Sequence, residues 1–358
     1  MHKDIIWQLK YTYLCWEIIR IMKAYKIVGA GLAGINLAWH FYFEKIKFVI
    51  VDNKERSTAR AAAGLINPVV FRRLNKSWMA DDLMPYLHSF YCKINDVLGK
   101  ELYVNLPIKK VITDIENLND WGARNNDEAY QQFYNEVEEN YNSSVLAEYG
   151  LGVVNGSGYL KLEEYINLSL EFFKAESNTV VEEEFEYDKV EGEIIFTEGR
   201  GLLRNPYFKY LPLNQTHGET LLIKAENLNI DYVLNKNMFV LPVEKNIYRV
   251  GATYNWEIKE PRTTEGAKAE LLEKLSQIVD CELEVLDQWA GLRPTVKDRR
   301  PLLGTHKEHK NLHVFNGLGT KGVMISPYFA NIFLQYLQGK RSLPQDVSIR
   351  RFDHLMNE

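Results

Sequence analysis

Short apolar runs and glycine-rich turns alternate near the start of the chain. Tyr25–Val28 is an apolar run that predicts a buried strand, and residues 47–52 predict a second strand. The residues between them predict a helix whose apolar positions face the sheet: Ile35, Leu37, Ala38 and Phe41. A strand, a tight turn, a helix and a second strand in this order are typical of a parallel βαβ unit.

Helical periodicity returns at several later places. It predicts helices over residues 81–99 and 262–279, of which the second is amphipathic. Residues 155–181 predict a turn followed by a helix and then a strand. Residues 100–150 are polar and acidic and have no clear period of two, so we expect mostly helix and loop there.

Strand patterns dominate the middle of the chain. Residues 192–199 predict another buried strand that ends on glycine. Residues 211–225 and 239–257 are alternating or β-branched runs, which are typical of an antiparallel sheet. The pattern therefore predicts an α/β fold that combines a parallel, nucleotide-binding unit with an antiparallel sheet.

The turn after the first strand has the glycine spacing of a dinucleotide site. Gly29 makes the tight turn, Gly31 lets the backbone approach a pyrophosphate, and Gly34 lets the helix pack close to the strand. The helix N-terminus presents free N–H groups to the phosphates. Asp52 ends the second strand, where a carboxylate binds ribose hydroxyls. This carboxylate disfavours NADP but does not separate NAD from FAD.

A second glycine-rich turn lies in the last quarter of the chain. Residues 312–315 predict a strand, which runs into NGLGTKG and then into a helix that begins at about Gly322, beside Lys321. One chain thus offers two glycine-rich turns at helix N-termini. A long cofactor could use both, with phosphates at the first and an electron-accepting ring at the second.

Charge and cysteine content narrow the function. The formal net charge of −5 gives no general attraction to nucleic acid or to anionic membranes. The three cysteines are far apart and form no disulfide framework, which favours a reducing, cytoplasmic location. The basic residues of one early segment have two open explanations, a solvated face or a role near anionic ligand groups: Arg60, Arg72, Arg73 and Lys76. His306 and His309 have no apparent third ligand, so we expect no metal site.

The N-terminus contains the most apolar stretch, but charged residues interrupt it. Lys10, Glu17 and Arg20 break the run, which predicts neither a membrane span nor a signal peptide. The first strand begins a few residues after Met22. We therefore expect residues 1–21 to be an upstream extension, although an amphipathic helix is also compatible with their pattern.

Seven segments spread over residues 25–337 together resemble one known family. They are VGAGLAG with Asp52, STARAAAGLINP, IIFTEG, LPLNQTHGETL, FVLPVEKNIYRVGAT, GLRPTVKDRRPLLG and NGLGTKGVMISP. In order and spacing they resemble the D-amino acid oxidase family of FAD-dependent oxidoreductases, the group that contains glycine and sarcosine oxidases. The resemblance implies a Rossmann-like FAD-binding domain (residues 22–90, 150–210 and 286–358). It also implies an inserted α+β substrate domain with the antiparallel sheet (residues 91–149 and 211–285).

The resemblance also implies the residues that would contact FAD. They are Gly29, Gly31, Leu32, Ala33 and Gly34 near the pyrophosphate, Asp52 and Asn53 near the ribose, Ala63, Gly64 and Gly199 along the cofactor, Val181 at the adenine, and Gly319, Thr320, Lys321 and Gly322 at the flavin. Some sarcosine oxidases hold FAD through a cysteine in the segment that here reads Gly291-Leu292-Arg293. No cysteine is present there, so the expected FAD is non-covalent.

Two residues are candidates for the chemistry itself. Arg293 matches the arginine that binds the substrate carboxylate in glycine oxidase-like members, and a guanidinium suits a carboxylate bidentately. Pairing with a structural acid such as Asp298 is the alternative. Lys321 and the helix N-terminus beside it would stabilise negative charge on the reduced flavin. Phe239 stands where glycine oxidase-like enzymes can place a carboxylate-binding tyrosine, which puts a small amino-acid substrate in doubt.

The function expected from this resemblance is oxidation of a C–N bond in an amine or amino acid. Hydride would pass from the α-carbon to flavin N5, and oxygen or another acceptor would take the electrons. Two alternatives stay open. LGTKG and FRRLNKSW also resemble an FAD domain that modifies a wobble uridine of tRNA, although the net charge makes nucleic acid an unexpected partner. The other alternative is a flavin-binding protein without turnover.

Overall fold

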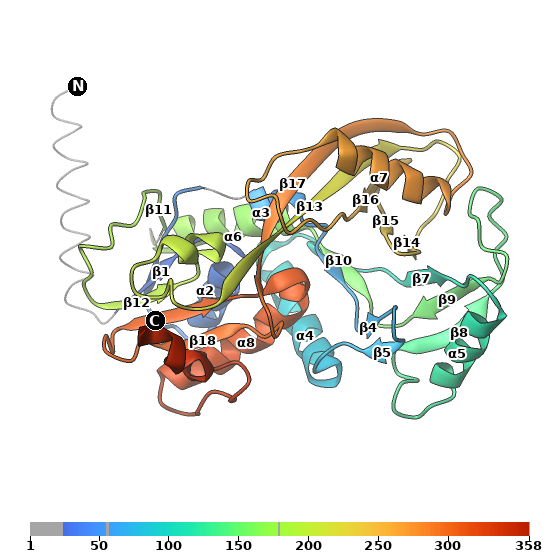
Figure 1. Cartoon of the computed structure of the whole chain (residues 1–358). Helices are drawn as coiled ribbons and strands as arrows, with labels where there is room; N and C mark the ends of the chain where they lie inside the picture. The colour runs from blue at the N-terminus through green and yellow to red at the C-terminus, as the bar shows by residue number, and fades with distance from the viewer. Residues whose placement is uncertain (1–23, 55–56, 178–179, 358) are drawn as a thin grey trace, which may run out of the picture.

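The computed structural model describes residues 24–54, 57–177 and 180–357, and the expected N-terminal extension lies outside them (Figure 1). The predicted βαβ unit forms at the start of this region. It consists of β1 (Tyr25–Val28), α2 (Leu32–Phe43) and β2 (Phe48–Val51). β1 and β2 pair in parallel, and every residue of β2 is buried, as an apolar run inside a parallel sheet should be.

The βαβ unit belongs to a six-stranded sheet. Its strand order is β11 (Val180–Val181), β2, β1, β12 (Glu193–Phe196), β19 (Leu312–Asn316) and β18 (Leu302–Thr305). The first five strands are parallel, and β18 is antiparallel to β19. The carboxyl ends of the parallel strands therefore meet at one edge, where ligands of doubly wound folds bind.

Helices pack around this sheet. They are α2, α6 (Leu162–Ser177) and α8 (Gly322–Leu337), and α4 (Ala80–Leu98) packs in turn on α8 and α6 (Figure 1). Asn36 of α2 joins them through buried hydrogen bonds. Its amide nitrogen donates to Tyr91 Oη at 3.2 Å and to Ser326 Oγ at 2.6 Å, and its oxygen accepts from Tyr165 Oη at 2.6 Å. One amide thus fixes α2 against three other helices, because a buried polar group must find partners.

The second large element is an eight-stranded, mostly antiparallel sheet. Its order is β17 (Glu284–Val296), β13 (Leu213–Lys224), β16 (Ile247–Gly251), β15 (Phe239–Glu244), β14 (Val233–Asn235), β7 (Ile108–Val111), β9 (Leu151–Val154) and β8 (Tyr134–Glu138). Only β14 and β7 pair in parallel within it. α7 (Glu265–Ser276) packs on the β13–β16 end through Leu271 and Leu275 (Figure 1).

Short elements complete the described chain. They are α3 (Ser57–Ala61), α5 (Ile115–Asn125), the sheet of β3 (Leu65–Ile66), β10 (Gly158–Leu160) and β6 (Tyr103–Asn105), the hairpin of β4 (Val69–Val70) and β5 (Asn75–Lys76), and the 3₁₀ helices η1 (Gly199–Arg204), η2 (Gly319–Lys321) and η3 (Ile349–Asn357).

The structure adds strands that the sequence did not indicate. Residues 100–150 are mostly helix and loop, as expected, and they also contain β6, β7 and β8, because these short strands pair with segments far away in the sequence. β9 and β17 lie in the eight-stranded sheet although they fall in ranges expected for the cofactor domain. The limits of the two domains therefore remain a proposal.

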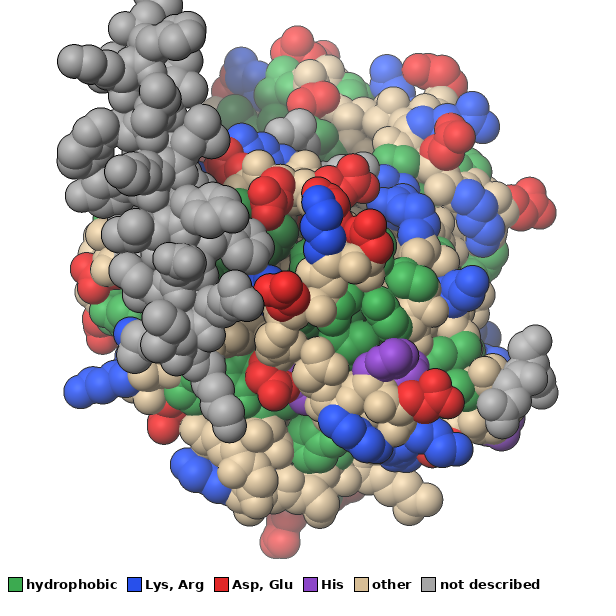
Figure 2. Space-filling model, turned by 90° about the vertical axis from the view of Figure 1, so that its left-hand side faces the viewer, with side chains coloured by type: hydrophobic (Ala, Val, Ile, Leu, Met, Phe, Trp, Pro, Cys, Tyr) green, Lys and Arg blue, Asp and Glu red, His purple; other side chains and the backbone are tan. Residues whose placement is uncertain are grey.

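The face seen in Figure 2 carries acidic and basic side chains interspersed, with apolar atoms between them. No large region of that face is covered by one sign of charge where atoms other than the grey ones are visible. Within the described residues, no helix has the length and apolar content needed to cross a membrane.

Candidate functional site

A cavity of about 510 Å³ lies between the two large sheets. Its wall contains the turns that follow β1, β2, β12 and β19, together with residues of β13 to β17. Most of the residues predicted from the sequence line it: Gly29, Gly31, Leu32, Ala33, Asp52, Asn53, Ala63, Gly64, Gly199, Arg293, Gly319, Thr320, Lys321 and Gly322. The folded chain thus gathers at one place residues that are up to about 290 positions apart in sequence.

The three glycines of the first turn occupy different environments. Gly29 has φ of +102°, which only glycine adopts at ease. A Cβ on Gly34 would lie 2.1 Å from the Gly29 carbonyl oxygen and 2.7 Å from Thr197 Oγ1, so α2 approaches the sheet too closely for any side chain. A Cβ on Gly31 would meet nothing within 4 Å, so the backbone there faces open space. This arrangement leaves Gly31 approachable by a phosphate.

Asp52 connects the ends of the first two strands. Its carboxylate accepts from Ala30 N at 2.9 Å and from Lys54 N at 3.2 Å, and only 7% of the residue is exposed. These bonds hold the turn after β1 against the turn after β2. The carboxylate also lines the cavity, so an acceptor stands where a ribose would present its hydroxyls.

Asn316, the last residue of β19, organises the second glycine-rich turn. Its side chain donates to Gly199 O at 3.0 Å and accepts from Gly317 N at 2.7 Å. The turns after β12 and β19 are therefore bonded to each other. Gly317 and Gly319 both have positive φ, which allows the sharp change of direction before α8 begins.

Lys321 points its ammonium at protein oxygens. Its Nζ donates to Asn67 O at 3.0 Å, and it contacts Val69 O and Ser77 Oγ as well. Loss of hydration lowers the pKa of Lys321 to about 8. The side chain thus ties the second glycine-rich turn to the β4 region, while the residue itself lines the cavity. The contacts of Lys321 Nζ are thus with protein oxygens, and Lys321 would influence a ligand in the cavity through its charge.

Arg293 has an environment that fits an anionic ligand. Its guanidinium lies over Gly218, where a Cβ would come within 2.0 Å of Nη1, and stacks on Tyr254 at 4.6 Å from the ring centre. Nη1 donates to two backbone carbonyls, at 3.3 and 3.4 Å. Burial lowers the pKa of Arg293, and no carboxylate among the described residues forms an ion pair with it. Asp298, the alternative partner, binds Arg351 at 2.9 Å instead.

Two predicted cofactor residues do not line the cavity. Gly34 lies behind the turn, where its role is close packing. Val181 pairs with β2 in the sheet, and its carbonyl accepts from Asp52 N at 3.0 Å. The cavity wall at this end is formed instead by Glu183, Glu184 and neighbouring residues, because the chain turns towards the cavity only after β11 ends.

Several residues of the wall were not predicted. They are Phe185, Tyr187, Glu198, Arg200 and Arg204 near the end of β12, and Asn235, Asn237, Met238 and Tyr254 at the other end. Tyr187 donates to Glu198, whose pKa is raised by burial. The acidic run around Glu183 looks like a solvated surface in the sequence, and no local signal marks it as part of a site.

The two ends of the cavity suit a long anionic cofactor. The N-caps of α2 and α8 supply no side-chain hydrogen bond, so both helix starts keep backbone N–H groups for a ligand.

The described cavity wall contains no cysteine, and Cys92 and Cys281 lie outside it. His306 binds backbone N–H groups of its own loop, and no three metal-ligating side chains gather in the part of the chain that is described. Fold and cavity thus define a dinucleotide-binding protein of the doubly wound class with an added antiparallel sheet.

A protein-family model described as "FAD dependent oxidoreductase" (DAO) matches residues 170–335. This part of the chain is therefore similar to an FAD-dependent oxidoreductase domain. Among curated proteins, the glycine oxidase of Geobacillus kaustophilus is 29% identical over 114 residues, which are 31% of this chain and 30% of that protein. The crystal structure of glycine oxidase from Geobacillus kaustophilus superposes with a TM-score of 0.75 at 17% identity, covering 92% of this chain and 97% of the other.

A second curated relative is named for a different function. The tRNA 5-methylaminomethyl-2-thiouridine biosynthesis bifunctional protein MnmC of Idiomarina loihiensis is 28% identical over 153 residues, which are 40% of this chain and 25% of that protein. The alignments thus span less than a third of either curated relative. The structural superposition establishes the fold and leaves the substrate open.

Proposed function

We propose that the protein is an FAD-dependent enzyme that oxidises a C–N bond of an amine or amino acid bearing a carboxylate. The observation that carries the proposal is Arg293, a guanidinium that lines the cavity and has no acidic partner among the described residues. A partly buried cation without a counter-ion is costly unless a ligand supplies the charge. The match to glycine oxidase supports the same substrate class. A cytoplasmic location and non-covalent FAD are part of this proposal.

Different residues would bind the parts of FAD and the substrate. The N–H groups at the start of α2 would bind the pyrophosphate, and Asp52 would bind the ribose. The start of α8, with Lys321 beside it, would offset negative charge at the other end. When bound, FAD supplies the two-electron acceptor for the oxidation. Arg293 would then hold the substrate carboxylate and so orient the amine-bearing carbon.

The first test is the visible spectrum of the purified protein, followed by anaerobic titration with amines and amino acids. Flavin absorbance that bleaches with a carboxylate-bearing amine, and not with the matching amine that lacks the carboxylate, is the expected result. A flavin that no amine bleaches would remove the proposed substrate class. A protein that neither contains nor takes up FAD would contradict the cofactor assignment as well.

A second candidate is oxidation of a modified uridine in tRNA, which the alignment with the tRNA-modifying protein favours. RNA binding would need basic surface, and the overall charge is −5. A mobility-shift experiment with bulk tRNA at two salt concentrations tests it. A salt-dependent mobility shift of tRNA that persists in the presence of small amine or amino-acid substrates would favour the tRNA function.

A further inference from the structure

The loop of residues 252–264 joins β16 to α7 and borders the Arg293 end of the cavity. Tyr254 of this loop lines the cavity and stacks on the Arg293 guanidinium, yet 60% of the tyrosine is exposed. Trp256, two residues further on, is 59% exposed. An aromatic ring that is mostly in solvent has little packing to hold it in place, so its position depends on what holds the loop.

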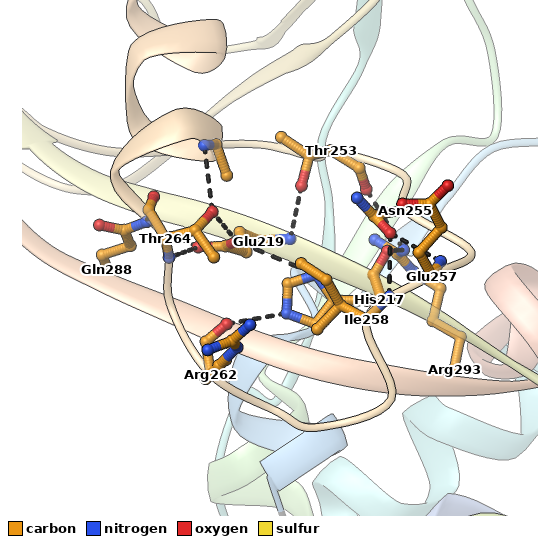
Figure 3. Close-up of polar contacts among 11 residues, drawn as sticks. His217, Glu219, Thr253, Asn255, Glu257, Ile258, Arg262, Thr264, Gln288 and Arg293 are labelled. Carbon is orange, nitrogen blue, oxygen red and sulfur yellow. Dashed lines mark hydrogen bonds and ion pairs between the residues drawn. The ribbon is translucent and has the colours of Figure 1, made fainter.

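Glu219 of β13 binds both ends of the 252–264 loop (Figure 3). At the first end, Glu219 N donates to Thr253 Oγ1 at 3.0 Å, and Thr253 N donates to Glu219 O at 3.2 Å. At the second end, Thr264 N donates to Oε2 at 2.9 Å and Thr264 Oγ1 donates to Oε1 at 2.8 Å. Gln288 Nε2 adds a third bond to the carboxylate at 2.6 Å. Glu219 is 1% exposed, so these donors replace its hydration.

His217, two residues earlier on β13, binds the middle of the same loop. Its backbone N donates to Asn255 O at 2.9 Å, and Asn255 N donates to His217 O at 3.0 Å. Its Nε2 lies 2.9 Å from Arg262 O, which requires a proton on Nε2 (Figure 3). Nδ1 finds no hydrogen-bond partner among the described residues and stands 3.9 Å from Glu219 Oε1. The loop is thus attached to one short stretch of β13 at both ends and in between.

The same stretch of β13 holds Arg293. Gly218, between His217 and Glu219, leaves room for the guanidinium, which a Cβ at that position would displace. Arg293 Nη1 also donates to His217 O and to Thr253 O. Residues 217–219 therefore fix the cation and the loop that carries Tyr254 relative to each other.

We propose that Glu219 is a positioning residue: its backbone binds Thr253, its carboxylate binds Thr264, and the loop held in this way keeps the Tyr254 ring over Arg293 and so shapes the carboxylate end of the cavity. Glu219 does not line the cavity and acts through the loop. The link to a substrate carboxylate rests on the proposed function, whereas the link between Glu219 and the loop does not.

The 252–264 loop contains trypsin sites whose cleavage rate reports how firmly the loop is held. Trypsin cleaves after Lys259 and Arg262, and Arg262 is held through its carbonyl by His217. Limited proteolysis of the FAD-loaded protein, followed by mass spectrometry, measures how often the loop opens. Glu219→Gln keeps the shape but replaces one of the two accepting carboxylate oxygens with an NH₂ group that donates, so we expect cleavage after Arg262 to rise about tenfold or more. Glu257→Gln, the same change on the exposed side of the loop, is the matched control and should leave the rate unchanged.

Acetate is the probe for the carboxylate end, with the flavin absorbance as readout. We expect Glu219→Gln and Tyr254→Ala each to raise the acetate Kd about tenfold, and Tyr254→Phe to leave it within about twofold, because the ring remains. Tyr254→Ala should not speed cleavage of the loop. If Glu219→Gln does not fold, Thr264→Val removes one bond to the carboxylate, with Thr264→Ser as the variant that retains it.

The outcomes separate this proposal from the proposed function. A wild-type protein that contains FAD but does not bind acetate contradicts the proposed function, while the proteolysis still decides whether Glu219 holds the loop. Unchanged cleavage in Glu219→Gln overturns the positioning role. Faster cleavage with an unchanged acetate Kd also overturns it, because Glu219 would then be structural only.

Discussion

Arg293 is held in place by contacts that do not neutralise its charge. Two backbone carbonyls, the surface of Gly218 and the ring of Tyr254 surround it. Arg293→Lys keeps the charge but loses the planar fork that matches a carboxylate. We expect kcat/KM for carboxylate-bearing amines to fall about tenfold to a hundredfold, with a smaller change for amines that lack the carboxylate.

Arg350→Lys is the matched control for this prediction. Arg350 lies in η3 and forms an exposed pair with Asp353 at 3.4 Å, outside the cavity wall. The same substitution there should leave kcat/KM unchanged. Equal losses for substrates with and without a carboxylate in Arg293→Lys would contradict carboxylate binding by Arg293.

Lys321 predicts a pH dependence of stability. Its pKa is about 8 in the folded protein, below the value of 10.5 for a free lysine, because burial disfavours the ammonium. Between these two values the unfolded chain binds more protons than the folded one, so the free energy of unfolding rises with pH. The lysine therefore destabilises the fold below pH 8, and this penalty is relieved as the pH rises towards 10.5.

Urea unfolding of the purified protein and of Lys321→Met at several pH values from 7 to about 10 measures this effect. The variant leaves three oxygens without their donor, which costs stability at every pH alike. As the pH increases beyond 8, the free energy of unfolding of the wild type minus that of the variant should increase by at most about 1.4 kcal/mol per pH unit. A difference that stays flat would show that Lys321 does not titrate in this range.

At the scale of elements, the first turn predicts a contrast between two glycines. Gly34→Ala forces a methyl group against the Gly29 carbonyl and Thr197, so it should cost about 3 kcal/mol of stability and abolish FAD retention. Gly31→Ala meets no atom within 4 Å and needs no unusual φ, so its cost should stay below about 1 kcal/mol. Its FAD Kd should nevertheless rise about tenfold, because the methyl occupies the approach of the phosphate.

Thermal unfolding and FAD titration of the two variants provide the measurement. Thr197→Ser serves as the control, because serine retains the hydroxyl that bonds to Val28 O and Gly29 O. Equal FAD affinity in Gly31→Ala and wild type would mean that the phosphates do not approach this turn.

The elements that the sequence predicts are those whose signal is local. β1, α2, β2, α4, α7 and the turn before α8 follow from periodicity, glycine spacing and caps. β7, β8, β9 and β14 escape prediction because each is short and acquires its partner from a distant segment. Similarly, Asp52 and Gly31 are visible in a motif, whereas Tyr254 and Glu198 reach the cavity only through the fold. The choice of Asp298 between Arg293 and Arg351 is likewise made by the fold, since nothing in the sequence indicates that Asp298 pairs with Arg351.

At the scale of the whole molecule, the cavity joins the two large sheets. Its wall takes residues from the parallel sheet and from β13, β15, β16 and β17 of the other. Bound FAD should therefore stabilise both, and at a hundred times its Kd the gain should be about 2.7 kcal/mol. Hydrogen exchange with and without added FAD checks this prediction: slower exchange is expected in β1 and β12 and also in β13 and β16. Protection limited to the six-stranded sheet would contradict a shared site.

The order of strands in the parallel sheet has a consequence for synthesis on the ribosome. β1 lies beside β12, and β12 lies beside β19, whose last residue is Asn316. While the nascent chain is still shorter than this, β12 presents an unpaired edge, and the turn with Gly319 and Lys321 does not yet exist. Such an edge invites pairing with other chains. A cofactor that contacts both glycine-rich turns can therefore be captured only after the ribosome has passed Lys321.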